Sequence, residues 1–200
     1  MAKQVKKVEV APSNNELRMR VILWISVAVG FIFLVSYTYI NYMEVQLPHL
    51  HLLSDRVLFT LRCQLFELLT VVVCVSVVAL QRFSTSAINP LAGHERVVQV
   101  TKNCLQNTME QFLLSSFSQL VLCTYINEEQ MKVIPLLVFF FVVGRITFFF
   151  GYLLSPMYRS FGFACTFIPT VITIIYCVYC VVTSGIGIYL GSNSYNLRMK

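Results

Sequence analysis

The chain has 200 residues, of which 57% are hydrophobic and 12% charged, and its mean hydropathy is +0.72. A soluble domain carries roughly twice that charged fraction, and several apolar runs reach the ~20 residues that a membrane-spanning helix needs. The composition therefore excludes a soluble globular domain and predicts an all-α, polytopic helix bundle in a lipid bilayer. The net charge is +6, and we expect the positive residues to set the orientation of the chain in the membrane and to contact anionic lipid. The sequence contains no nucleic-acid-binding motif.

Five spanning helices are expected, and their approximate ranges are 21–42, 57–82, 95–126, 131–154 and 161–190. Residues 1–20 form a basic tail that predicts a cytoplasmic N-terminus. An odd number of spans then places the short tail 191–200 on the outer side of the membrane.

Cysteines and histidines point to no redox or metal chemistry in the sequence. All seven cysteines fall in or near apolar runs, where a thiol behaves as a small apolar side chain. Cys177 and Cys180 have C-x-x-C spacing, but a hydrophobic helix is not the βαβ context of a redox motif. His49, His51 and His94 are scattered, so no metal-ligand cluster is expected.

Three charged residues lie inside predicted spans, and we expect them to have a structural role. Glu67 lies deep in the second span, where it either pairs with a cation on another helix or is protonated. Arg145 lies deep in the fourth span and is expected to be neutralised by a carboxylate. Glu110 and Glu67 are the candidates, within one chain or across a subunit interface.

A polar stripe runs along the first half of the third span. Its members recur every three or four residues and so share one face of a helix: Arg96, Gln99, Asn103, Gln106, Asn107 and Glu110. Inside a bilayer such a stripe must face other helices, a ligand or a watery cavity. Spacing alone leaves two interpretations open, a polar pocket or a set of interhelical hydrogen bonds.

Two groups of residues within 57–190 form a recognisable pattern. The first group is Glu95-Arg96-Val97, then Asn103 and Asn107. The second group lies in and after the fourth span: Gly144-Arg145, Gly151-Tyr152, and Arg159 seven residues after Tyr152. In these residues and their order, the chain resembles the family of membrane-associated proteins in eicosanoid and glutathione metabolism (MAPEG). The chain departs from the family at Gln99, Gln106 and Phe148, where an arginine, a glutamate and a tyrosine are usual.

The resemblance implies a homotrimer that binds glutathione between subunits near the cytoplasmic surface. It also implies roles for single residues: Arg159 would stabilise the glutathione thiolate, Tyr152 would position it, and Asn103 would contact the peptide. A guanidinium favours the nucleophilic thiolate over the thiol. The alternatives are a lipid-headgroup anchor for Arg159 and an interface aromatic for Tyr152. The ligand-binding set that the resemblance implies is Arg96, Gln99, Asn103, Gln106 and Asn107.

The departures concern the charges of the ligand. Glutathione has two carboxylates and one ammonium, and glutamine replaces the charge of neither an arginine nor a glutamate. Each lost charge-assisted contact costs roughly 1.5–3 kcal/mol, so two losses would weaken binding by about a hundredfold or more. Glu110, one turn beyond Gln106, could substitute in part, but not while it neutralises Arg145.

The extra span at 21–42 resembles the mattrin-like branch of the family. That branch implies a non-enzymatic regulator of membrane trafficking or of receptors, which acts on other membrane proteins. The expected location is the endoplasmic reticulum, Golgi or lysosomal membranes, or the plasma membrane. The alternative is a glutathione-dependent transferase or peroxidase for lipophilic electrophiles. A transporter or channel is a third hypothesis, but the charged residues form no repeat or relay that supports it.

Overall fold

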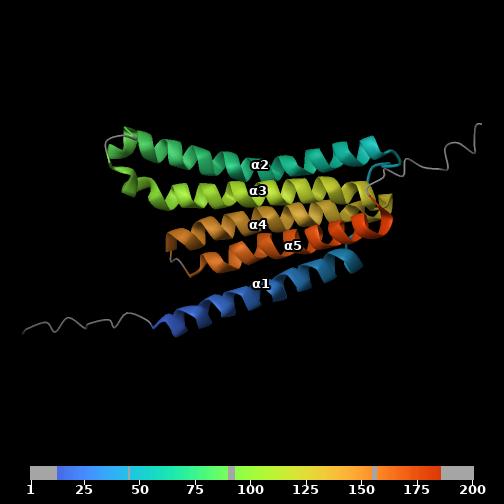
Figure 1. The fold of residues 1–200 in the computed structure, drawn as a ribbon, viewed down its shortest axis with the longest axis horizontal. Helices are drawn as coiled ribbons and strands as arrows, with labels where there is room; N and C mark the ends of the chain where they lie inside the picture. The colour runs from blue at the N-terminus through green and yellow to red at the C-terminus, as the bar shows by residue number, and fades with distance from the viewer. Residues whose placement is uncertain (1–12, 45, 90–92, 155–156, 186–200) are drawn as a thin grey trace, which may run out of the picture.

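The computed structural model describes residues 13–44, 46–89, 93–154 and 157–185, which form a bundle of long α-helices (Figure 1). The five α-helices in these residues are α1 (Asn14–Tyr42), α2 (Leu53–Phe83), α3 (Gln99–Tyr125), α4 (Val133–Leu154) and α5 (Arg159–Ser184). Short 3-10 helices lie in the links, namely η1 (Ser86–Ile88), η3 (Glu95–Val98) and η4 (Glu128–Lys132). The all-α helix bundle expected from the sequence is confirmed.

Four helices of the described residues are long and apolar enough to cross a membrane: α1, α2, α4 together with η4, and α5. The polar side chains of α3 keep it out of this group, but α3 runs beside α2 along the bundle (Figure 1). Its 27 residues make a helix of about 40 Å, longer than the hydrocarbon core of a bilayer. The chain is therefore an integral, multi-pass membrane protein, and its orientation stays a prediction.

Helix bounds differ from the expected ones mainly at the N-terminus. α1 begins at Asn14, because Ser13 caps it by accepting a hydrogen bond from the Glu16 N–H at 3.3 Å. Arg18 and Arg20, assigned to the basic tail, therefore lie on the helix. The rest of that tail up to residue 12, the end of the fifth span at 190 and the tail 191–200 lie outside the described residues.

The links divide the bundle into two ends (Figure 1). One end, called the N-terminal end here, holds the start of α1 together with the α2–α3 and α4–α5 links. The opposite end holds the α1–α2 and α3–α4 links. α1 packs at the margin against α5, where the rings of Trp24 and Phe31 lie 6.4 Å and 5.8 Å from that of Phe161.

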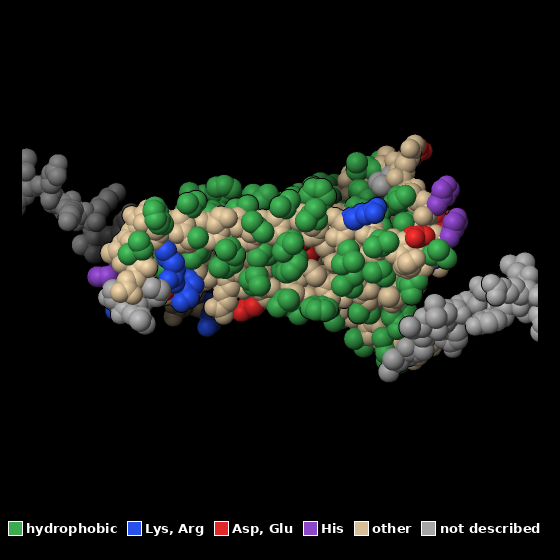
Figure 2. Space-filling model, turned by 90° about the horizontal axis from the view of Figure 1, so that it is seen from above, with side chains coloured by type: hydrophobic (Ala, Val, Ile, Leu, Met, Phe, Trp, Pro, Cys, Tyr) green, Lys and Arg blue, Asp and Glu red, His purple; other side chains and the backbone are tan. Residues whose placement is uncertain are grey.

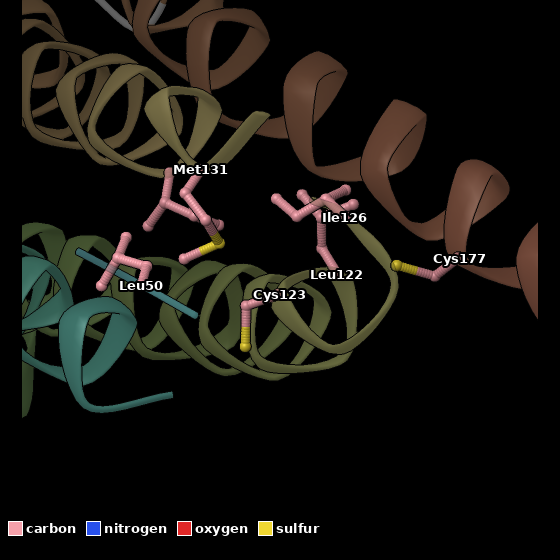
Figure 3. Packing of buried hydrophobic residues seen from close by; sticks show 7 residues of the cluster. Leu50, Leu122, Cys123, Ile126, Met131 and Cys177 are labelled. Atoms are coloured by element: carbon pink, nitrogen blue, oxygen red, sulfur yellow. The ribbon is translucent and has the colours of Figure 1, made fainter. Parts of the chain in front are cut away.

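Buried apolar side chains gather at the opposite end, where two links meet α3 and α5 (Figure 3). Leu50 of the α1–α2 link packs there with Ile126 and Met131 beside the α3–α4 turn. Near the N-terminal end, α4 and α5 approach closely, because a Cβ at Gly144 would lie only 2.9 Å from the Gly162 carbonyl oxygen. Figure 2 shows mainly apolar side chains along the middle of the visible face, as a lipid-facing surface requires.

Candidate functional site

A pocket of about 590 Å³ lies near the N-terminal end, between α1, α3, α4 and α5. Four polar side chains of α3 line one wall, and Tyr152 and Arg159 come from the end of α4 and the first residue of α5. Val21 and Ile25 of α1 add an apolar wall. The pocket therefore combines amide, carboxylate, phenol and guanidinium groups with an apolar side.

The predicted polar stripe is divided by the structure. Asn103, Gln106, Asn107 and Glu110 line the pocket. Arg96 and Gln99 are exposed and do not line it.

Two hydrogen bonds connect residues four apart along this exposed face. Gln99 Nε2 donates to Asn103 Oδ1 at 2.8 Å, and Gln106 Nε2 donates to Glu110 Oε1 at 3.1 Å. These bonds lie within α3 and hold the side chains along the pocket wall. Because they join no second helix, they favour the pocket interpretation of the stripe for this part of α3.

Tyr152 and Arg159 are in direct contact. The guanidinium carbon of Arg159 lies 4.9 Å from the centroid of the Tyr152 ring, in a cation–π arrangement. Gly151 permits this approach, because a Cβ there would lie 2.8 Å from the carbonyl carbon of Tyr158 and 2.9 Å from the nitrogen of Arg159. The glycine before Tyr152 thus lets α5 begin against the last turn of α4, which fixes the guanidinium at the pocket.

Arg145 is buried behind the pocket and joins three helices. Its Nη1 donates to Asn107 Oδ1 of α3 at 2.8 Å, and its Nη2 donates to Thr166 Oγ1 and, at 3.5 Å, to the Gly162 carbonyl of α5. The Phe148 ring lies 4.7 Å from the guanidinium carbon. Neutral oxygens and an aromatic face therefore surround the guanidinium.

The expectation that Glu110 or Glu67 of the same chain neutralises Arg145 is wrong. No carboxylate of the described residues pairs with Arg145, and its hydrogen bonds there go to neutral oxygens. Glu110 bonds to Gln106 on its own helix, whereas Glu67 lies between α2 and α3. Neither carboxylate faces Arg145, and helical spacing in the sequence does not show which neighbour a side chain meets. A partner from a second subunit stays a prediction.

Glu67 is fully buried and makes hydrogen bonds with polar side chains of α3. It accepts from Gln119 Nε2 at 2.6 Å, from Ser115 Oγ at 3.1 Å and from Ser116 Oγ at 3.5 Å. Gln64, one turn earlier on α2, donates to the Ser116 carbonyl at 2.9 Å. No cation pairs with Glu67 in the described part of the chain, so the cation pairing expected as one possibility is not seen there.

The residues that join α2 to α3 are thus partly ones that the sequence analysis did not single out. Gln64 and Glu67 are three apart on α2, and Ser115 and Gln119 are four apart on α3. This spacing is a signal for two polar faces. What the sequence lacks is the information that these two faces meet.

A second group lies at the opposite end, where the structure brings together side chains that are scattered in the sequence. One ligand atom from each of His49, His51 and Glu128 lies within 4.8 Å of the others. His51 Nδ1 is 2.9 Å from Glu128 Oε2. The sequence did not reveal the group, because folding brings Glu128 to two histidines that are almost eighty positions earlier.

These features define a class: a polytopic α-helical membrane protein with a charged polar pocket near one end of its bundle. The sequence model of the MAPEG family matches residues 59–179, which is 121 of the 200 residues. The chain belongs to the MAPEG family.

Two curated relatives are both named Transmembrane protein 79, or mattrin. The Mus musculus protein is 28% identical over 132 residues, which cover 66% of this chain and 34% of that protein. The Bos taurus protein is 29% identical over 122 residues, which cover 61% of this chain and 31% of that protein. The chain thus matches about a third of the length of these relatives, and the expected likeness to mattrin is confirmed. No solved structure matches the chain.

Proposed function

We propose that this MAPEG protein is a non-catalytic regulator of secretory, lysosomal or plasma membranes, acting in membrane trafficking or on receptors. Its pocket is one that has lost part of its affinity for glutathione. The observation that carries the proposal is the charge of the pocket wall. Among the described residues that line it, Arg159 is the cation and Glu110 the anion.

Glutathione needs one cation more than this wall supplies. Arg159 can meet one of the two carboxylates, and Glu110 can meet the ammonium, because Glu110 is not engaged with Arg145. Gln99, at the position of a family arginine, lies outside the lining. One missing charge-assisted contact costs roughly 1.5–3 kcal/mol, or about a tenfold to hundredfold loss of affinity. This is a smaller loss than the two missing charges expected from the sequence.

The test is calorimetric titration of glutathione into the purified, detergent-solubilised chain and into a Gln99→Arg/Gln106→Glu variant. We expect binding by the variant and binding at least tenfold weaker, or none, by the native chain. A Gln130→Glu variant, altered at an exposed glutamine of η4 at the opposite end, controls for added charge. Equal, tight binding by the native chain and the double variant would contradict the proposal.

The second candidate is a glutathione-dependent transferase or peroxidase for lipophilic electrophiles, with glutathione as its cosubstrate. The contact between Arg159 and Tyr152 favours it, because both side chains line the same pocket as Asn103. In this mechanism Arg159 stabilises the thiolate and Tyr152 donates a hydrogen bond to it. Arg159→Ala should then abolish conjugation, while Arg96→Ala, altered at an exposed arginine outside the pocket, should not. Unchanged turnover in Arg159→Ala would refute this assignment.

We further propose that the chain forms a homotrimer, with membrane-protein partners binding the assembled bundle. The support is the exposed polar face of α3, where Gln99, Asn103, Gln106 and Glu110 are exposed in the single chain. Exposed amides and a carboxylate are costly in a bilayer and are stabilised when a neighbouring subunit covers them. Native mass spectrometry of the solubilised protein tests this, and a monomer at all protein concentrations would contradict it.

A further inference from the structure

Two histidines of the α1–α2 link project from the same side of the chain at the end opposite the pocket. Leu50, between them, is buried at 3% exposure, whereas His49 and His51 are exposed. The two imidazole rings are stacked, with centroids 5.7 Å apart and planes 17° from parallel. Burial of the middle residue thus turns both imidazoles outward together.

The link is tied to the α3–α4 turn, which supplies the carboxylate. The Leu50 N–H donates to Glu128 Oε1 at 2.8 Å, and the Leu50 carbonyl accepts from Arg56 Nε at 3.0 Å. Arg56 Nη1 also donates to the Ile126 carbonyl at 2.8 Å. These bonds hold the carboxylate of Glu128 with one oxygen on the backbone of Leu50 and the other, Oε2, facing His51 at 2.9 Å.

We propose that His49, His51 and Glu128 form a binding site for a divalent transition-metal ion of the Zn²⁺ type. Imidazole nitrogen and carboxylate oxygen are typical zinc ligands, and two histidines with one carboxylate leave a fourth position for water. The backbone bond to Glu128 Oε1 is the kind of supporting contact that orients a metal-bound carboxylate.

The distances allow a metal to enter with side-chain rotation alone. Tetrahedral bonds of about 2.0–2.1 Å place neighbouring ligand atoms about 3.3 Å apart. The three ligand atoms here lie within 4.8 Å of one another, and His51 Nδ1 lies 2.9 Å from Glu128 Oε2. These two atoms must therefore separate by about 0.4 Å for tetrahedral coordination. Exposed imidazoles can do this, since the side chain of His51 is 74% exposed.

A bound ion would join the α1–α2 link to the α3–α4 turn. Figure 2 shows histidine side chains beside acidic ones at this end of the molecule, away from the apolar middle. The site is therefore reached from the aqueous phase. Metal binding at this site does not depend on whether the pocket binds glutathione, because the site lies at the end of the bundle opposite the pocket.

The experiment titrates ZnCl₂ into the full chain, purified in detergent with an affinity tag that contains no histidine. We expect one saturable site, weakened at least tenfold by His51→Ala and by Glu128→Gln. Matched controls are His94→Ala and Glu129→Gln, which alter an exposed histidine at the other end and the exposed neighbouring carboxylate; both should bind like the native chain. His49→Ala, altered at the third proposed ligand, should also weaken Zn²⁺ binding.

Co²⁺ absorption separates this site from the seven free cysteines. Bound Co²⁺ should show a ligand-field spectrum without a sulfur-to-metal charge-transfer band, and His51→Ala should remove that spectrum. Circular dichroism of each metal-free variant shows that it is folded. The proposal is overturned if Zn²⁺ does not bind, if His51→Ala and His94→Ala bind equally, or if the Co²⁺ spectrum is that of thiolate ligands.

Discussion

Replacing Glu67 by alanine should destabilise the bundle, because Glu67 carries three hydrogen bonds between α2 and α3. Interhelical hydrogen bonds in membranes contribute about 0.6 kcal/mol on average and up to about 1.7 kcal/mol each. Loss of the three bonds from Gln119, Ser115 and Ser116 therefore costs about 2 kcal/mol, and the cavity adds to this cost. At about 2–4 °C per kcal/mol for a chain of this size, the midpoint of unfolding should fall by at least about 4–8 °C.

The assay is thermal unfolding in detergent, followed with a thiol-reactive dye that labels the buried cysteines as they become exposed. Glu129→Ala is the control, because Glu129 is an exposed carboxylate of η4, away from the proposed subunit contact on α3; it should change the midpoint by less than about 2 °C. Glu67→Gln keeps one acceptor oxygen for Gln119 and should cost less than Glu67→Ala. The reasoning fails if Glu67→Ala is no less stable than Glu129→Ala.

Three further predictions concern the α4–α5 contact and the pocket. Gly162→Ala should reduce the free energy of unfolding by about 1–3 kcal/mol through overpacking, because its Cβ would lie 2.6 Å from the Phe148 Cα. The thermal unfolding midpoint should fall accordingly, and an unchanged midpoint would contradict this packing. Gly151→Ala should weaken glutathione binding without loss of helix content, since its Cβ would meet the Tyr158 backbone and displace the start of α5. Calorimetry measures the affinity, and equal affinity of the variant and the native chain would contradict this prediction. Ile25→Ser should weaken binding of an S-hexyl glutathione conjugate roughly fivefold relative to unmodified glutathione, and a parallel loss for both ligands would argue against an apolar wall.

The sequence predicted the elements of the pocket well because its signals are local. Helical spacing places Asn103 and Asn107 on one face of α3, and the short α4–α5 link keeps Tyr152 near Arg159. These residues do come together in the structure. Their assignment as ligand-binding or catalytic groups stays a prediction, because geometry alone does not show what the pocket binds.

Contacts between distant segments could not be predicted in the same way. A period of three to four residues shows which face of a helix is polar, but not which neighbour that face meets. The sequence left Glu67 either paired with a cation or protonated, and it did not show that this carboxyl group meets Gln119. The sequence likewise does not show that His51 lies beside Glu128, because this contact depends on the burial of Leu50 against the α3–α4 turn.

The contribution of α1 changes what the pocket can hold. Val21 and Ile25 place an apolar wall beside the polar side chains of α3, while Arg159 and Glu110 supply one charge of each sign. A small, highly charged peptide leaves the apolar wall without a partner and one of its own carboxylates without a cation. A ligand with one anionic group and an apolar part, such as a lipid or a thiol-bearing conjugate, would match both walls. We therefore expect the apolar wall from α1 and the glutamine at position 99 to act together, favouring amphiphilic ligands over glutathione.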